Sequence, residues 1–290
     1  MIHASSPLID IGVNLSASRL SRQADNVITR AARSGVHGMI LTGTSVNSSV
    51  TCVKYAEELS RQATEGQRGC QLWSTAGVHP HDAATASEED ASWYEEISRL
   101  LDHAHVVAVG ECGLDFERNY SPPEIQKEVF EAQLKLAVRH QLPLFLHQRG
   151  AHPEFYELLK RYAPELPKRG DRLAAVVHCF TDGRAELERY VELGCFVGIT
   201  GWVCDERRGE ALRDAVQVLP LDRVLVETDA PYLTPRTLRP KPKGGVNEPA
   251  FLPHIVAELA GYMDVKVDEL SRWATQNTCE LFSISLAGAA

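Results

Sequence analysis

The chain has 290 residues, of which 44% are hydrophobic and 24% charged, and this composition excludes a disordered or a collagen-like protein. The length allows one or two domains, because a single α/β barrel uses about 250 residues. The 39 acidic and 30 basic side chains give a net charge of −9, which disfavours a protein that passively coats nucleic acid. A phosphate-bearing substrate would therefore need a local basic patch or a metal ion.

The seven cysteines form an odd set without a C-x-x-C pair, which argues against a disulfide framework and against a zinc ribbon. The first residues lack the basic and apolar regions of a signal peptide, and no apolar run reaches the roughly 18 residues of a membrane span. We expect a cytoplasmic, unprocessed monomer with no membrane partner.

Short apolar segments of β character alternate along the chain with longer segments of helical period. One helix is expected over 122–140, where Ser121 and Glu124 have the spacing of a capping box. The predicted strands cover residues 8–15, 38–44, 72–79, 106–111, 143–147, 173–180, 196–201 and 224–229.

Eight β-then-α units in succession predict a single TIM (β/α)8 barrel over residues 1–290, with C-terminal helices over 249–283 packing on it. An open, doubly wound sheet is the alternative. In a barrel, the chemistry lies at the C-terminal ends of several strands.

Four side chains that can bind a metal stand at predicted strand ends: Glu111, His147, His178 and Asp229. An ionised carboxylate beside histidines in an apolar barrel mouth calls for a cation. Mixed imidazole and carboxylate ligands suit Mg²⁺, Mn²⁺ or Zn²⁺, and the lack of a cysteine pair argues against a closed structural zinc site. We therefore predict an open catalytic metal site.

Strand alternation gives expectations for the neighbours of these residues. Glu227 lies one layer deeper than Asp229 and would be a costly buried charge unless it is paired. Cys112 and Cys179 have the opposite parity to the predicted ligands, so both are expected to pack outward as small apolar residues.

Candidate substrate-binding residues flank the same strand ends. Arg149 can reach a phosphate bidentately or form a salt bridge at the rim. Aromatic rings there can stack on an unpaired base or simply pack over the mouth. The other candidates are Arg207, Arg208, Trp202, Tyr232 and the basic segment 236–243, with Arg236, Arg239, Lys241 and Lys243; such charge runs are commonly just solvated loops.

Five motifs along the chain are distinctive: Ser74-Thr-Ala-Gly-Val-His-Pro-His81, Gly110-Glu-Cys-Gly-Leu-Asp115, His178-Cys-Phe-Thr181, Gly198-Ile-Thr-Gly-Trp-Val-Cys-Asp-Glu-Arg-Arg-Gly209 and Glu227-Thr-Asp-Ala-Pro-Tyr-Leu233. Over essentially the whole chain, they resemble the TatD family of metal-dependent deoxyribonucleases.

The resemblance implies an amidohydrolase-type barrel with Glu111, His147 and His178 as metal ligands and Asp229 as ligand or general base. It also implies 3′-to-5′ exonuclease action on single-stranded DNA ends, with RNA as a further substrate, and a part in DNA repair. Mg²⁺ is the expected metal, with Mn²⁺ or Zn²⁺ as alternatives.

One segment departs from many relatives, which carry an H-x-H pair in the first strand. Here Gly12 and Asn14 hold those two positions, in the form that one subgroup of the family shows. Glycine offers no side-chain ligand and a neutral amide is a weak one. We expect one tight site, with Asp229 and Asn14 near a second, weaker site, and with Asp10, His79 and Glu227 as further supporting or weak ligands.

Two other functions remain open at this point. A metal-activated water also attacks carbonyl carbon, which leaves an ester or amide hydrolase such as an aminoacyl-tRNA deacylase. A nucleic-acid-binding protein on an inactive barrel is the alternative that is not an enzyme, and the retained acids and histidines argue against it.

Overall fold

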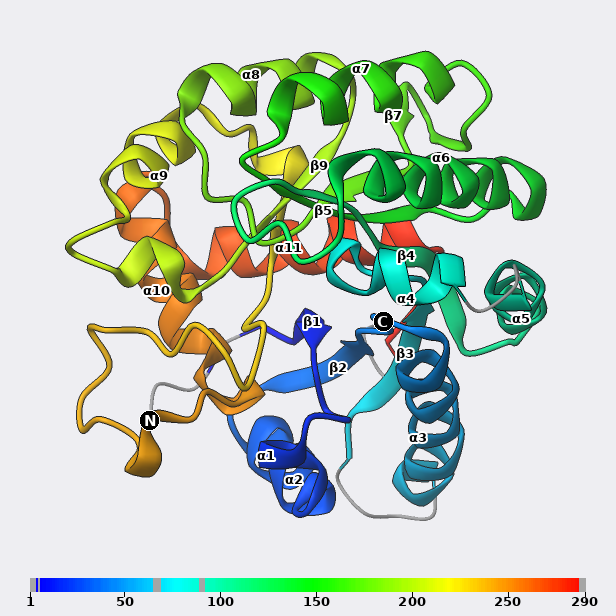
Figure 1. Cartoon of the computed structure of the whole chain (residues 1–290). Coiled ribbons are helices and arrows are strands. Elements are labelled where there is room, and N and C mark those ends of the chain that lie inside the picture. Colours follow the sequence, from blue (N-terminus) through cyan, green and yellow to red (C-terminus); the bar gives the residue numbers. More distant parts are fainter. Residues whose placement is uncertain (1–3, 5, 65–68, 89–91, 287–290) are drawn as a thin grey trace.

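The computed structural model describes residues 4, 6–64, 69–88 and 92–286. Eight parallel strands pair in chain order around a barrel (Figure 1). The last strand meets the first through the parallel bridge between Val13 and Ala230. The predicted TIM barrel is therefore confirmed, and the open sheet is wrong. The barrel strands are β1 (Leu8–Val13), β2 (Val36–Leu41), β3 (Gln71–Ala76), β4 (Val106–Asp115), β5 (Leu144–Arg149), β8 (Ala175–Val177), β9 (Phe196–Ile199) and β10 (Val224–Val226).

Helices surround the barrel (Figure 1), and a small hairpin of β6 (Lys168–Arg169) and β7 (Arg172–Leu173) precedes β8. In the described residues, none of the helices has the length and apolar character needed to cross a membrane. The helices are α1 (Ser18–Ser21), α2 (Ala24–Arg33), α3 (Val46–Thr64), α4 (Ala83–Glu88), α5 (Ser92–Leu101), α6 (Pro123–His140), α7 (His152–Tyr162), α8 (Arg184–Glu192), α9 (Glu210–Ala215), α10 (Leu252–Tyr262) and α11 (Val267–Phe282).

The predicted helix over 122–140 is α6, but the predicted capping box is wrong. The residue before the helix is Pro122, and no side chain in the described part of the chain caps the helix start. The Ser121 hydroxyl instead donates to the carbonyl of His81 and accepts the N–H of Ala84. It thereby ties the start of α6 to the loop after β3, which lies in the mouth of the barrel.

The apolar core has two layers. The larger layer lies between the strands and the surrounding helices. The smaller layer fills the barrel interior with side chains such as Ile11, Phe145, Phe196 and Leu225, and it also contains Leu281 and Phe282. These last two residues end α11, so the final helix contributes to the inside of the barrel as well as to its wall.

The strands are irregular where they approach the mouth. The pairing of β1 with β2 shifts between Asp10 and Val13, and that of β4 with β5 shifts between Val109 and Cys112. Such bulges break the alternation of side chains and re-aim the residue at the bulge. The bulge in β1 contains Gly12. The bulge in β4 contains Glu111, whose side chain points toward the histidines at the mouth of the barrel.

Asp10 links the first strand to the segment after the last strand, where the barrel closes, from within the core. Its carboxylate accepts the N–H of Thr228 at 2.9 Å and the Thr228 hydroxyl at 2.5 Å, and a weaker bond comes from the N–H of Gly12 at 3.3 Å. Asp10 is fully buried and lies outside the cavity lining. Its bonds to Thr228 join β1 to the segment after β10.

We predict that the stabilising effect of Asp10 depends on pH. Burial raises the pKa of Asp10 to about 8. The unfolded chain keeps the ordinary value near ~3.9. Between these values the folded protein holds a proton that the unfolded chain has lost, so the stability that Asp10 contributes falls as the pH rises. The free energy of unfolding of the wild type, minus that of Asp10→Asn, should shrink from about pH 5 to about pH 8 in chemical denaturation.

The matched control is Asp25→Asn, since Asp25 is an exposed aspartate on α2. Its difference from the wild type should stay constant over the same interval. A wild-type advantage over Asp10→Asn that grows with pH would contradict the assignment.

Candidate metal centre and active site

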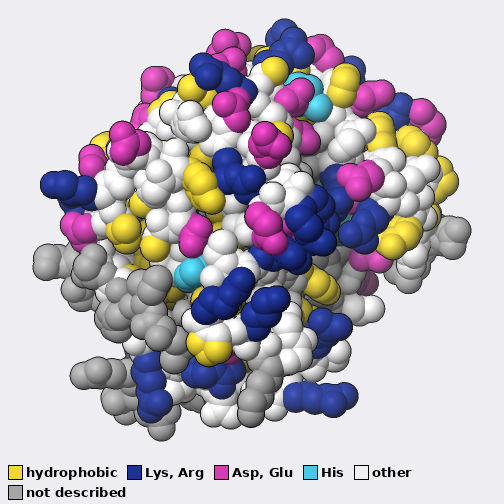
Figure 2. All heavy atoms as spheres, turned by 90° about the vertical axis from the view of Figure 1, so that its left-hand side faces the viewer, with side chains coloured by type: hydrophobic (Ala, Val, Ile, Leu, Met, Phe, Trp, Pro, Cys, Tyr) yellow, Lys and Arg dark blue, Asp and Glu magenta, His cyan; other side chains and the backbone are white. Residues whose placement is uncertain are grey.

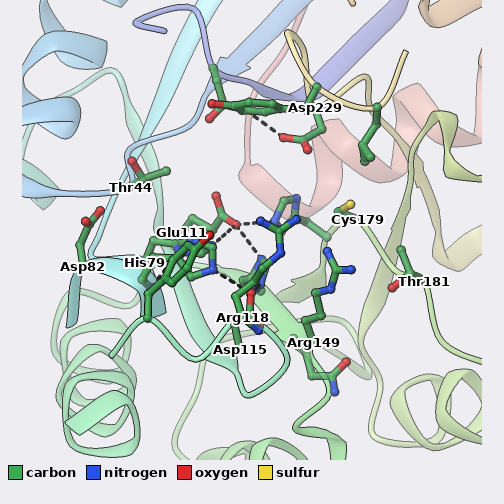
Figure 3. A pocket seen from close by; sticks show the side chains of 18 of the residues that line it. Thr44, His79, Asp82, Glu111, Asp115, Arg118, Arg149, Cys179, Thr181 and Asp229 are labelled. Carbon is green, nitrogen blue, oxygen red and sulfur yellow. Dashed lines mark hydrogen bonds and ion pairs between the residues drawn. The ribbon is translucent and has the colours of Figure 1, made fainter. Parts of the chain in front are cut away.

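One carboxylate oxygen lies at the centre of three imidazole rings (Figure 3). The Oε1 atom of Glu111 is 2.8 Å from Nε2 of His178, 2.9 Å from Nδ1 of His147 and 3.2 Å from Nε2 of His79. Glu111 comes from the bulge in β4, His147 from β5, His178 follows β8, and His79 follows β3. Four neighbouring strand ends therefore contribute to this group.

The charges of this group suit a divalent cation. Burial alone raises the pKa of Glu111, yet His178, His79 and the hydrogen bonds hold it well below its usual range. Burial lowers the pKa of His178, but Glu111 and Glu227 raise it well above its usual range. Without a metal, a proton on His178 balances the charge of Glu111 and Glu227. A divalent cation beside Glu111 would balance the same charge and leave the imidazole neutral.

Donor geometry supports the same conclusion. Ligand atoms of His79, Glu111 and His147 all lie within 4.8 Å of one another. Among the residues that the structure describes, none forms a hydrogen bond with the buried Nε2 atom of His147, although Asp115 Oδ2 lies 3.5 Å away. Neutral imidazole nitrogens and a carboxylate oxygen at such separations match the ligand sets of Zn²⁺ and Mn²⁺ and are compatible with Mg²⁺.

Glu227 holds His178 from below. Its Oε2 atom is 3.2 Å from Nδ1 of His178, and its Oε1 atom accepts the N–H of Cys179 at 2.6 Å. The buried charge that the sequence flagged is therefore paired. A hydrogen bond to Nδ1 leaves Nε2, the atom that faces Glu111, free to act as a ligand.

Two glycines make room for this buried carboxylate. A Cβ atom on Gly12 would lie 2.2 Å from Oε2 of Glu227, and one on Gly198 would lie 2.6 Å from Oε1. Any side chain at position 12 would displace Glu227. In this structure the Glu227 carboxylate fills the space beside Gly12, where a side chain would otherwise lie.

Asp115 supports the imidazoles from a second side. Its Oδ2 atom lies 2.8 Å from Nε2 of His81, and its carboxylate is 1% exposed. His81, His79 and His147 form a chain of edge-to-face ring contacts. Sequence reasoning did not assign a role to Asp115 or His81, although the Gly-Leu-Asp and His-Pro-His segments that carry them stand beside predicted ligands.

Asp229 lies across the cavity from the Glu111 cluster (Figure 3). The Nδ2 atom of Asn14 donates to its Oδ1 atom at 2.9 Å. Burial and the charges of Glu111 and Glu227 raise the pKa of Asp229 to about 7, against the effects of His178 and Asn14. A carboxyl group with such a pKa can take up and release a proton near neutral pH.

The prediction for one cysteine is wrong. Cys112 packs in the apolar layer outside the barrel as expected, but Cys179 lines the cavity. Cys179 has a left-handed backbone, with φ of 47°, and strand alternation no longer applies there.

The cavity has a volume of about 620 Å³ and contains most of the predicted mouth residues. Arg149, Trp202 and Tyr232 line it as the sequence suggested. Arg149 also forms a bidentate ion pair with Glu117, at 2.7 and 2.9 Å, so the rim salt bridge is present. Arg118 and Tyr120 line the cavity too, and sequence reasoning missed both because they belong to an irregular loop.

Three predicted arginines lie outside the cavity lining and are paired with acids. Arg207 and Arg208 both bind Asp205, and Arg236 binds Glu206 at 3.1 Å and approaches Asp205. Figure 2 shows basic side chains gathered with acidic ones on the left-hand side of the molecule in Figure 1. The guanidinium of Arg208 also lies 4.2 Å above the Trp202 ring, which links these residues to the edge of the cavity. The side chain of Lys243 lies outside the described residues.

Comparison with solved structures supports the fold. The TatD homologue YjjV of Escherichia coli K12 superposes with a TM-score of 0.81 at 29% identity, covering 96% of this chain and 98% of the other. An uncharacterized amidohydrolase from Saccharomyces cerevisiae has the same fold, with a TM-score of 0.80 at 21% identity, covering 96% and 100% of the two chains.

Sequence comparison gives the same relationship. A protein named "3'-5' ssDNA/RNA exonuclease TatD" from Klebsiella pneumoniae (strain 342) is 47% identical over 281 residues, covering 97% of this chain and 100% of the relative. A protein with the same name from Erwinia amylovora is 47% identical over 277 residues, covering 96% and 100%. The family model described as TatD related DNase matches residues 9–283. The chain therefore belongs to the TatD related DNase family.

Proposed function

We propose that the protein is a metal-dependent 3′-to-5′ exonuclease that hydrolyses phosphodiester bonds at the ends of single-stranded DNA and RNA. The observation that carries the proposal is the convergence of Glu111, His79, His147 and His178 in a cavity that Asp229 also lines. The names of the relatives supply the substrate and the direction.

Glu111, His147 and His178 are the proposed ligands, and His79 is close enough to Glu111 to join them. A divalent cation held by these residues, with Mg²⁺ as the first choice and Mn²⁺ or Zn²⁺ as alternatives, would lower the pKa of a water molecule and neutralise charge on the phosphoryl oxygens. Glu227 and Asp115 hold the imidazole rings in position.

Asp229 is the proposed general base, and it receives the proton of the attacking water. Its pKa of about 7 lets it accept a proton during the attack and return one to the leaving oxygen. The bond from Asn14 fixes the carboxylate so that Oδ2 remains available to the substrate. Asn14 thus acts as a positioning residue.

The cellular setting is part of the same proposal. All seven cysteines are free thiols, which suits a reducing compartment such as the cytoplasm. We propose that the enzyme acts there as a monomer on strand ends, and that trimming such ends contributes to DNA repair.

The decisive experiment is incubation of end-labelled single-stranded DNA or RNA with Mg²⁺, Mn²⁺ or EDTA. We expect stepwise release of mononucleotides from the 3′ end, which EDTA abolishes. His178→Ala, purified in parallel, controls for contaminating nucleases. Intact oligonucleotide beside hydrolysis of an aminoacyl ester would instead identify a deacylase.

Substitution of Asp229 tests the general base. Asp229→Asn should lower kcat by about 10² to 10⁴ at saturating metal, because the amide cannot accept the proton. Asp82→Asn is the control, since Asp82 is another carboxylate of the same cavity and should keep most of the turnover. Near-full turnover in Asp229→Asn would remove the assigned role.

Metal binding is measured by calorimetry on protein stripped of metal. We expect one tight site, and a second site that is weaker or forms only with substrate. His178→Ala should weaken the tight site by about 100-fold or more, and Glu227→Gln by about 10- to 100-fold, because Glu227 orients the ligand.

His103→Ala is the control for histidine removal, since His103 lies outside the cavity lining. Two equally tight sites in the free enzyme would contradict the single-site hypothesis.

A further inference from the structure

Carboxylates outnumber guanidinium groups in the cavity lining, although a nucleic-acid substrate is itself negatively charged. Two guanidinium groups, those of Arg118 and Arg149, face a lining that contains four carboxylates: Asp82, Glu111, Asp115 and Asp229. Arg149 is also neutralised by its bidentate pair with Glu117. A cation held beside Glu111 would compensate the nearby acids, and a strand with several phosphates would gain from a further positive contact.

Arg118 can supply that contact. Among the described residues, no carboxylate forms an ion pair with its side chain, whereas Arg149, Arg207, Arg208 and Arg236 are each paired. Both Arg118 and Arg149 extend into the cavity (Figure 3). Arg118 is therefore the uncompensated guanidinium in this lining.

The loop that carries Arg118 is tied to the imidazole cluster. The Oδ1 atom of Asp115 accepts the N–H of Glu117 at 3.1 Å and the N–H of Arg118 at 2.8 Å, while its Oδ2 atom binds His81. The Tyr120 ring packs edge-to-face on His81, with centroids 4.7 Å apart. The Asp115 carboxylate thus positions the His81 ring and also closes the turn that carries Arg118.

We propose that Arg118 binds a phosphate of the strand next to the one being cleaved, an inference that rests on the proposed nuclease function. The planar fork of a guanidinium donates two parallel N–H bonds to the oxygens of one phosphate. A substrate with a single phosphodiester cannot use this contact. Arg118 therefore makes the enzyme prefer polynucleotides over isolated diesters.

The test compares two substrates. One is a single-stranded oligonucleotide and the other is bis(p-nitrophenyl) phosphate, which has one phosphodiester. Arg118→Ala should raise KM for the oligonucleotide by about 10- to 100-fold and leave kcat within about twofold. The parameters for the small diester should change by less than about twofold, which a distorted metal site would not permit.

Two further variants sharpen the result. Arg118→Lys keeps the charge without the fork and should lie between wild type and Arg118→Ala. Arg272→Ala removes an arginine on α11 that is paired with Asp268 and should behave as wild type. An unchanged oligonucleotide KM in Arg118→Ala, or a matching loss on the small diester, overturns the inference.

Fluorescence anisotropy of a labelled oligonucleotide in Ca²⁺ or in EDTA separates the inference from the proposed function. Weaker binding by Arg118→Ala, beside a wild type that cleaves no oligonucleotide, supports phosphate binding by Arg118 and refutes the exonuclease. Cleavage by the wild type with equal binding by both proteins supports the exonuclease and refutes the inference.

Discussion

The buried carboxylate of Glu227 constrains the whole mouth of the barrel. This carboxylate is fully buried, and His178 and the N–H of Cys179 compensate the cost of burying it. It fits because Gly12 and Gly198 have no side chains to fill the space that it occupies. Gly12 leaves that space open, and so β1 supplies no side-chain ligand at position 12. The candidate metal ligands lie around Glu111, and Asp229 faces them across the cavity (Figure 3).

The acidity of the chain and its chemistry are compatible because charge is arranged locally. Arg149, Arg208 and Arg236 each form an ion pair with an acidic side chain. These pairs carry little net charge, so the arginines do not create an extended positive surface. Such a surface attracts bulk nucleic acid weakly. Recognition then depends on a few directed contacts at the cavity, which suits an enzyme that must release its strand after each cut.

The barrel could be predicted from the sequence because apolar periodicity marks its strands and helices. Four cavity residues could be predicted because they are polar residues at predicted strand ends: Glu111, His147, His178 and Asp229. Sequence reasoning misjudged Cys179, since strand alternation fails at a left-handed residue. It undervalued His79, which lies beyond the end of β3, and Asp115, whose role depends on contacts with His81 and with the loop that follows β4. Arg118 was invisible for another reason. Its position depends on a turn closed by an aspartate side chain, and neither hydrophobic period nor motif spacing encodes that contact.

The end of α11 has a consequence for assembly. Leu281 and Phe282 pack inside the barrel with Ile11, a residue at the other end of the sequence. The barrel interior is thus completed by contacts of very long sequence separation, which carry a large loop-closure entropy cost. A fragment that stops before residue 281 retains all the proposed ligands but has an incomplete barrel core.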